Sequence, residues 1–343
     1  MNRLILLTTT AFVAFGASFP AFADNATITQ TNETNGFATQ HQPGGTFGFQ
    51  ANDTATILQQ AGTGDTATQE QSRSNDGDDF AISGVQSITQ MNNSPAMASQ
   101  EDNGVIDTQN ITQTNNIGGT TATQTINAEF GNNNTQTSSQ DSNNGSFVTQ
   151  TYGINPTNGA QGDFNTQTAT QNGQTGSSIS QVIDGGNTSN NTESATQNYG
   201  GSTNTISALI EGGTNDHISQ TQDLNVSNSM QTASFNLSSG NVITQYQGVG
   251  SGGNTQTYTN DQSSGGAGLQ YQAAGATNST QTITQLGTGG DYANQAGQGQ
   301  SGNGNSETIT QSGGFGNNAI QNQGLNPGQT GYVFLSGGAL THN

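Results

Sequence analysis

Few residues of this sequence could take part in acid-base, nucleophilic or metal chemistry. The three histidines, His41, His217 and His342, are far apart along the chain, and there is no cysteine. A Ser-His-Asp site would need one of these histidines to be held by a rigid core. The acidic run Asp76-Gly77-Asp78-Asp79 could offer oxygen ligands to calcium, although its spacing matches neither an EF-hand loop nor a Gly-Gly-x-Gly-x-Asp repeat. We expect no enzymatic activity, no catalytic residue, no cofactor and no metal, and interpret the acidic run as charge that keeps the chain soluble.

Side-chain amides are the chemical groups that recur with a fixed spacing. The 343 residues include 41 glutamines and 43 asparagines. A β-branched residue, a Thr or Ser and a Gln follow one another nine times, as in Ile28-Thr29-Gln30. On a β-strand the first and third of these residues share one face, while the residue between them points to the other face. Stacked amides satisfy each other's donors and acceptors, so the pattern predicts hydrogen bonding between repeated units.

The spacing of the glutamines indicates how these units are arranged. Gln30, Gln40, Gln50 and Gln60 are ten residues apart, and pairs such as Gln245 and Gln256 are eleven apart. Glycine-rich and asparagine-rich segments lie between them, and these residues suit tight turns. We predict an all-β fold without helices, a β-solenoid of stacked strand-turn-strand repeats that forms amyloid, with coils of about 20 to 23 residues.

Two sets of residues are expected to line the inside of this solenoid. The glutamines expected to form a ladder that templates self-assembly are Gln30, Gln60, Gln90, Gln113, Gln150, Gln181, Gln220, Gln245, Gln285 and Gln311. The residues expected to form an apolar inner row beside them are Ile28, Leu58, Ile88, Ile111, Val148, Ile179, Ile218, Ile243, Ile283 and Ile309. The aromatic residues, such as Tyr152, are expected near turns and irregular stretches.

Three segments can be distinguished along the chain. Residues 1–23 have the cation, apolar stretch and Ala-Phe-Ala ending of a secretory signal peptide cut before Asp24. Residues 24–325 carry the solenoid repeats. Residues 326–343 contain the apolar run Tyr332-Val333-Phe334-Leu335, which either caps the stack or docks onto the next molecule. We therefore expect a secreted, extracellular protein.

Composition and charge exclude several classes of protein. Hydrophobic residues make up 27% and charged residues 7% of the sequence, which is too little of both for a conventional enzyme core. With Arg3 in the signal peptide, Arg73 is the one cation left against 22 acidic residues. Nucleic-acid binding by counterion release requires several cations, so no nucleic-acid partner is expected. Nor do we expect membrane insertion after processing or disulfide bonds.

The repeats resemble those of the curlins, the secreted subunits of bacterial curli fibres. The family pattern is apolar-x-Gln-x-Gly-x-x-Asn-x-Ala-x-x-x-Gln, and the segment from Leu58 to Gln71 follows it with Asp65 in place of Asn. The segments from Ile283 to Gln295 and from Ile309 to Gln321 fit with one additional turn residue. The resemblance implies a fimbrial subunit at the cell surface that polymerises with itself into curli-like amyloid for adhesion and biofilm matrix. It also implies a curli-type nucleator and a dedicated outer-membrane secretion pore as partners.

Two alternatives to fibre formation stay open. A solenoid that does not polymerise could act as a surface adhesin. Segments such as Thr54-Ala55-Thr56 and Thr168-Ala169-Thr170 could instead place pairs of threonines on one flat face, as some ice-binding β-solenoids do. The simpler explanation of these threonines is their preference for a solvated strand face.

Overall fold

The computed structural model describes most of the chain as strands and turns. It describes residues 25–41, 54–71, 84–104, 106–127, 133–153, 163–184, 188–237, 239–262, 264–287, 294–313, 316–336 and 339–342. The predicted signal peptide and the acidic run from Asp76 to Asp79 lie outside these ranges. Within them all regular structure is β, so the prediction of an all-β solenoid is confirmed.

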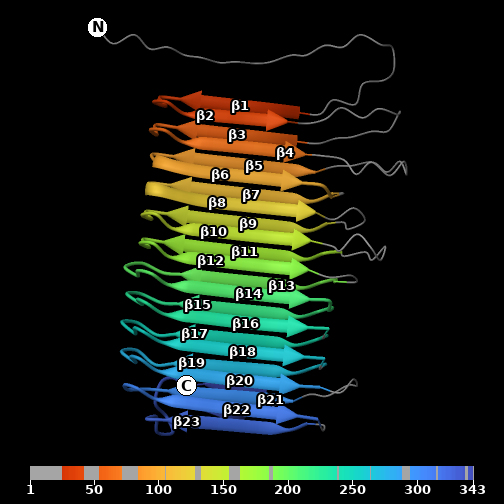
Figure 1. Ribbon diagram of the computed structural model, residues 1–343, viewed down its shortest axis with the longest axis vertical. Helices are drawn as coiled ribbons and strands as arrows, with labels where there is room; N and C mark the ends of the chain where they lie inside the picture. The colour runs from red at the N-terminus through yellow and green to blue at the C-terminus, as the bar shows by residue number, and fades with distance from the viewer. Residues whose placement is uncertain are drawn as a thin grey trace.

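Successive strands alternate between two parallel sheets. Within each sheet the strands stack along the long axis of the molecule (Figure 1). The odd sheet has twelve strands: β1 (Asn25–Thr31), β3 (Thr54–Gln60), β5 (Val85–Met91), β7 (Thr108–Thr114), β9 (Thr135–Asp141), β11 (Thr166–Asn172), β13 (Thr192–Gln197), β15 (His217–Gln222), β17 (Val242–Gln247), β19 (Ala267–Gln272), β21 (Gln295–Gln300) and β23 (Asn318–Gln323). The even sheet has eleven: β2 (Phe37–His41), β4 (Thr66–Gln71), β6 (Ser94–Asp102), β8 (Ile117–Asn127), β10 (Phe147–Gly153), β12 (Ser178–Asp184), β14 (Thr205–Glu211), β16 (Met230–Asn236), β18 (Thr255–Asp261), β20 (Thr280–Leu286) and β22 (Ser306–Ser312).

The alternation of side chains explains why these segments are strands. In β11 the inward residues Gln167, Ala169 and Gln171 are buried, and the threonines between them are partly exposed. Most strands present up to three such inner positions, and parallel pairing places equivalent positions of successive coils over one another. A shift of one residue would expose the apolar set and bury the threonines, so the pattern fixes the register.

The coils are longer than the sequence spacing predicts. Hydrogen-bonded glutamines of successive coils are between 23 and 31 residues apart, as at Gln90 to Gln113 and Gln59 to Gln90. The predicted length of 20 to 23 residues holds only for the shortest coils, such as that from Gln90 to Gln113. Most coils are longer, because the segment that connects one strand to the next often has more residues than a step of ten or eleven allows.

The turns are held by a second type of side-chain ladder. Asn93, Asn116 and Asn143 lie one above another, and each Oδ1 accepts the backbone N–H of the next coil at 2.8 to 2.9 Å. Asn115, immediately before Asn116, has a φ of 54°, a conformation that asparagine tolerates better than most residues. Asparagine therefore serves both the shape of the turn and the contact between coils.

The core consists of narrow apolar rows between the sheets. Ile57, Ile88 and Ile111 form part of one cluster near the N-terminal end. Toward the C-terminal end the largest fully buried side chains include Phe235 and Tyr258, whose rings meet edge to face with centroids 6.3 Å apart. Tyr152, expected near a turn or irregular stretch, is the penultimate residue of β10 and is buried at an inner position of this strand.

The C-terminal segment folds back on the outer face of the odd sheet. β24 (Val333–Ser336) and β25 (Ala339–His342) form an antiparallel hairpin, and this hairpin contacts β19, β21 and β23. Gly297 leaves the space that Val333 occupies, because a Cβ there would meet the valine side chain. The hairpin thus covers a side of the stack, whereas the sequence suggested a cap or a docking strand at its end.

No helix in the described residues is long and apolar enough to cross a membrane.

Candidate functional site

A glutamine ladder runs the full length of the odd sheet. Every strand of this sheet places one glutamine at its third inner position: Gln30, Gln59, Gln90, Gln113, Gln140, Gln171, Gln197, Gln222, Gln247, Gln272, Gln300 and Gln323. From Gln30 to Gln300 each Nε2 donates to the Oε1 of the next coil at 2.5 to 3.5 Å. The ladder joins the coils independently of the backbone.

Shorter ladders occupy other inner positions. In the even sheet one ladder runs from Gln40 to Gln181 and another from Gln231 to Gln281. Ladder amides also donate to the opposite sheet, as Gln113 Nε2 does to the carbonyl oxygen of Met97 at 3.0 Å. These bonds matter because a buried amide left unpaired costs about 1 to 3 kcal/mol.

All of these ladders point the same way. In each hydrogen bond along a glutamine ladder the Nε2 group belongs to the earlier coil and the Oε1 group to the later one, as from Gln220 to Gln245. The stack therefore has a direction along its long axis. Its N-terminal end presents amide oxygens, since the Nε2 of Gln30 is already used toward Gln59.

Amide and apolar rows exchange sheets partway along the stack. The second inner positions of the odd sheet read Ile28, Ile57, Ile88, Ile111, Ser138, Ala169, Ala195, Gln220, Gln245, Gln270, Gln298 and Gln321. Those of the even sheet read Gln40, Gln69, Gln100, Gln124, Gln150, Gln181, Ala208, Ala233, Tyr258, Ile283 and Ile309. Where this row is apolar in one sheet, it consists of amides in the other. Between β12 and β15 the row of the odd sheet changes from apolar to amide, and that of the even sheet changes from amide to apolar.

The structure distributes nine of the ten predicted ladder glutamines over four rows. Gln30, Gln90 and Gln113 lie in the full-length ladder; Gln150 and Gln181 lie in the even sheet; Gln220 and Gln245 lie in the odd sheet; and Gln285 and Gln311 lie in the third row of the even sheet. The predicted apolar residues other than Leu58 likewise lie on the inner face, beside these glutamines.

Gln60 and Leu58 are exceptions, and their predicted inward orientation is wrong. Gln60 is exposed, Leu58 points outward, and Ile57 and Gln59 take the inner positions of β3. The sequence Ile57-Leu58-Gln59-Gln60 offers an apolar residue and a glutamine two apart in either register. The β-branched Ile57 and its pairing with Ile88 decide for the first.

Sequence reasoning missed ladder glutamines that do not have a β-branched apolar residue two positions before them. In β9 the inner residue two positions before Gln140 is Ser138, and Gln140 is nevertheless part of the full-length ladder. In β11 the small residue Ala169 lies two positions before Gln171, which was not predicted either and belongs to the same ladder. The signal that could have found both is the step of 31 residues from Gln140 to Gln171.

Buried carboxyl groups end two of the ladders. Gln167 Nε2 donates to Glu193 Oε2 at 2.9 Å, and Gln281 Nε2 donates to Glu307 Oε2 at 3.1 Å. Burial raises the pKa of Glu193 to about 8 and that of Glu307 to about 7. Burial and the nearby charge of Asp102 also raise the pKa of Asp107 to about 8. These groups therefore hold protons at pH values where an exposed carboxyl would be ionised.

The ends of both sheets are open in the described part of the chain. β1 and β2 are the first strands of their sheets and β23 and β22 the last, with neighbours on one edge only. The inner residues Gln321 and Gln323 of β23 are exposed, because the even sheet has no strand opposite them. Strand edges of this kind pair readily with further strands.

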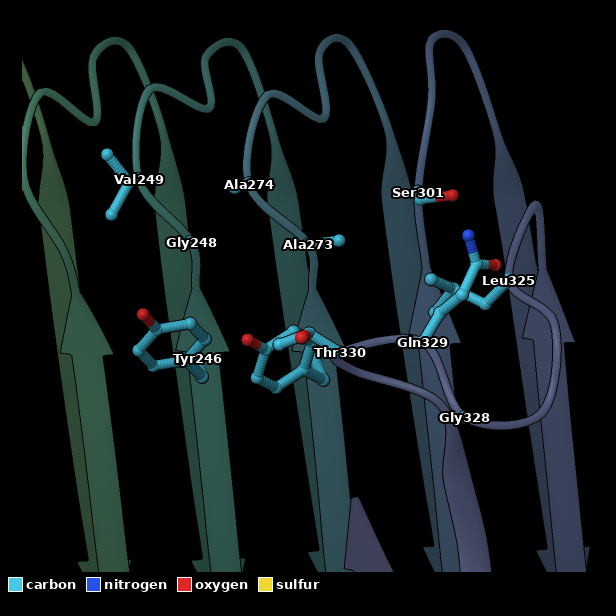
Figure 2. Close-up of a pocket in the computed structure, with 11 residues that line it drawn as sticks. Tyr246, Gly248, Val249, Ala273, Ala274, Ser301, Leu325, Gly328, Gln329 and Thr330 are labelled. Atoms are coloured by element: carbon cyan, nitrogen blue, oxygen red, sulfur yellow. The ribbon is translucent and has the colours of Figure 1, made fainter. Parts of the chain in front are cut away.

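A shallow groove of about 600 Å³ lies between the C-terminal segment and the outer face of the odd sheet. Figure 2 shows Tyr246 on one of its walls and the chain through Gly328, Gln329 and Thr330 on another. The ring of Tyr246 stacks on that of Tyr271 with centroids 4.8 Å apart. In the described residues no group of three histidine, cysteine or acidic side chains forms a possible metal site.

The outer face of the even sheet carries a continuous column of hydroxyl groups. Each of its eleven strands contributes one residue: Thr39, Thr68, Ser99, Thr123, Thr149, Ser180, Ser207, Thr232, Thr257, Thr282 and Thr308. The adjacent column is interrupted by the bulky residues Phe37, Met97, Phe147 and Met230.

No protein-family model matches this sequence, and a search of curated proteins finds no match. The resemblance to curlins therefore rests on the residue pattern alone and stays a prediction.

Proposed function

We propose that the protein is a secreted structural subunit that assembles end to end into curli-like amyloid fibres at the bacterial cell surface. The observation that carries this proposal is the pair of open ends, where both sheets and the glutamine ladders stop without a covering element in the described residues. Natural monomeric solenoids cover such ends. The C-terminal hairpin lies on a side of the stack and leaves its edge strands accessible.

The biological role proposed for such fibres is adhesion and formation of biofilm matrix. Export across the inner membrane, a dedicated outer-membrane pore and a nucleator protein belong to the same proposal, since they follow from the resemblance to curlins. A fibre subunit needs no catalytic residue and no cofactor. The ladder amides account for the amide-rich composition of the chain.

The proposal is tested by following assembly of the purified protein. We expect thioflavin fluorescence to rise over days at micromolar concentration, with fibres in electron micrographs and a fibre-diffraction spacing of about 4.7 to 4.8 Å. A protein that stays monomeric, with the circular dichroism of a folded β-protein, would contradict it.

A matched pair of variants tests whether the strand edges carry assembly. Ile28→Lys places a charge at an inner position of the first strand, whereas Thr29→Lys places the same charge on its outer face. Because 1.4 kcal/mol lost at an interface corresponds to a factor of ten, and an unpaired buried charge costs more than this, Ile28→Lys should slow elongation about tenfold or more. Thr29→Lys should elongate nearly as the wild type does.

The hydroxyl column supports a second candidate function, binding of an ordered water lattice by the monomer. Thr149→Lys would disrupt the column, and Thr112→Lys on the odd sheet is the matched control, since both threonines are exposed. Thermal hysteresis that is lost only in Thr149→Lys would favour ice binding. Bulky residues interrupt the neighbouring column, so we place fibre assembly first.

A further inference from the structure

The last coil of the stack ends on an odd-numbered strand, which decides what can follow it. β23 belongs to the odd sheet, so the position that would continue the path of the chain lies in the even sheet, next to β22 and opposite β23. This vacant half coil is where the inner residues of β23 are exposed. A second copy placed in the same orientation would put its own β1 on β23 and leave β22 without a partner at that level.

The second inner positions of the two ends match only when the sheets are exchanged. β22 presents Ile309 and Gln311 at its second and third inner positions, and β1 presents Ile28 and Gln30 at the same positions. If β1 of another copy lay on β23 instead, the apolar Ile28 would face the amide of Gln321.

The second strand of the coil gives the same result. β23 presents Ala319 and Gln321 at its first and second inner positions, and β2 presents Ala38 and Gln40 there. The turns between these strands, residues 313–317 and 32–36, are both five residues long. One arrangement therefore aligns two strands and the turn that joins them.

We infer that a second copy of this chain stacks on the C-terminal end after a half turn about the long axis, with its β1 on β22 and its β2 on β23. This inference rests on the proposed function and specifies its interface. The exchange of amide and apolar rows within each molecule is what makes its two ends complementary in this arrangement. After a half turn, the amide row of the odd sheet continues into that of the even sheet of the next copy, and the apolar rows continue likewise.

The direction of the hydrogen bonds agrees with this arrangement. Ladder Nε2 groups donate toward the C-terminal end throughout the stack. The Oε1 of Gln40 at the start of a second copy would then accept from Gln321, whose side chain is exposed. Head-to-tail stacking preserves this direction from one copy to the next, whereas joining two like ends would bring acceptors against acceptors or donors against donors.

Cysteine cross-linking distinguishes the half turn from direct stacking, and the chain has no cysteine of its own. Thr27, Thr39, Thr308 and Ile320 all lie on outer faces and are exposed. In the half-turn arrangement Thr27 of the second copy is adjacent to Thr308 of the first, and Thr39 of the second copy is adjacent to Ile320 of the first. Neighbouring strands are about 4.8 Å apart, within the Cα separation that a disulfide spans.

Four double variants use these four cysteine positions, two as matched pairs and two as crossed pairs. Oxidised fibres of Thr27→Cys with Thr308→Cys, and of Thr39→Cys with Ile320→Cys, should run as covalent multimers on non-reducing gels. The crossed combinations are Thr27→Cys with Ile320→Cys and Thr39→Cys with Thr308→Cys. Their oxidised fibres should run as monomers on the same gels, because the paired cysteines then lie on opposite outer faces. Circular dichroism of each variant before assembly checks that it has folded.

The outcomes separate this inference from the proposed function. Multimers from the matched combinations alone support the half turn. Fibres that cross-link through Thr27→Cys with Ile320→Cys, or through none of the four, overturn the half turn while leaving self-assembly in place. If folded variants and wild type alike form no fibres, both the half turn and the proposed function are overturned.

Discussion

Replacing Glu193 by glutamine should remove much of the pH dependence of folding. Glu193 is fully buried at the first inner position of β13, where Gln167 donates to its Oε2 and Ile218 occupies the next coil. Its Oε1 has no hydrogen-bond partner in the described structure. A glutamine at this position would keep an acceptor for Gln167 and could not ionise.

The size of the effect follows from the shift in pKa. The pKa of Glu193 rises from 4.5 to about 8 on folding, because burial disfavours the ionised form. Between these values the folded chain keeps a proton that the unfolded chain has lost, so the free energy of unfolding decreases as pH rises. The stabilisation is complete below about pH 4.5 and is lost by about pH 8; at 1.36 kcal/mol per pKa unit it amounts to about 5 kcal/mol.

The measurement is urea unfolding of the monomer, followed by circular dichroism at pH 5, 7 and 9. We expect the wild type to lose stability over this range and Glu193→Gln to lose about 4 kcal/mol less, because about three pKa units of the shift lie above pH 5. Glu211→Gln is the matched control, since it removes the same charge from an exposed position on β14. Equal pH dependence of Glu193→Gln and wild type would refute the reasoning, as would an equal effect of the control.

Further substitutions test the core, the turns and the tail. Phe235→Ala should lower the free energy of unfolding by about 3 to 5 kcal/mol in urea, since it empties a fully buried position; a loss below 1 kcal/mol would contradict the assigned core. Asn116→Ala leaves the buried N–H of Asn143 without its acceptor and should cost about 1 to 3 kcal/mol, whereas Asn110→Ala on the outer face should cost little. Deleting residues 331–343 should leave fibre growth in place, because the hairpin covers a side of the stack; loss of thioflavin-positive fibres would show instead that the hairpin forms part of the contact between molecules.

Local pattern was enough to predict the strands, their inward side chains and the stacking of amides. Triplets such as Ile111-Thr112-Gln113 specify a face and a register at once, and the structure places Ile111 and Gln113 inside. Where the pattern was ambiguous, prediction depended on a neighbour. The segment from Ile57 to Gln60 reads equally well in two registers, and only pairing with β5 selects one of them.

Other features depend on contacts that no local pattern contains. To predict the exchange of rows between the sheets, one must know that Gln220 follows Ala195 in the same column. The lengths of the turns between the two residues determine this. The burial of Tyr258 depends on Gly268, where a Cβ would meet the tyrosine ring. The raised pKa of Glu193 likewise arises from its place between Gln167 and Ile218, two residues far from it in sequence.

The common direction of the ladder amides gives the rod an electrical axis. Each primary amide has a dipole comparable to that of a peptide unit, about 3.5 D, and those of the full-length row are oriented alike. Rods lying alongside one another would lower their electrostatic energy by running in opposite directions, so bundles should contain equal numbers pointing each way. A single rod should orient in an electric field, and its two tips should accept new subunits at unequal rates.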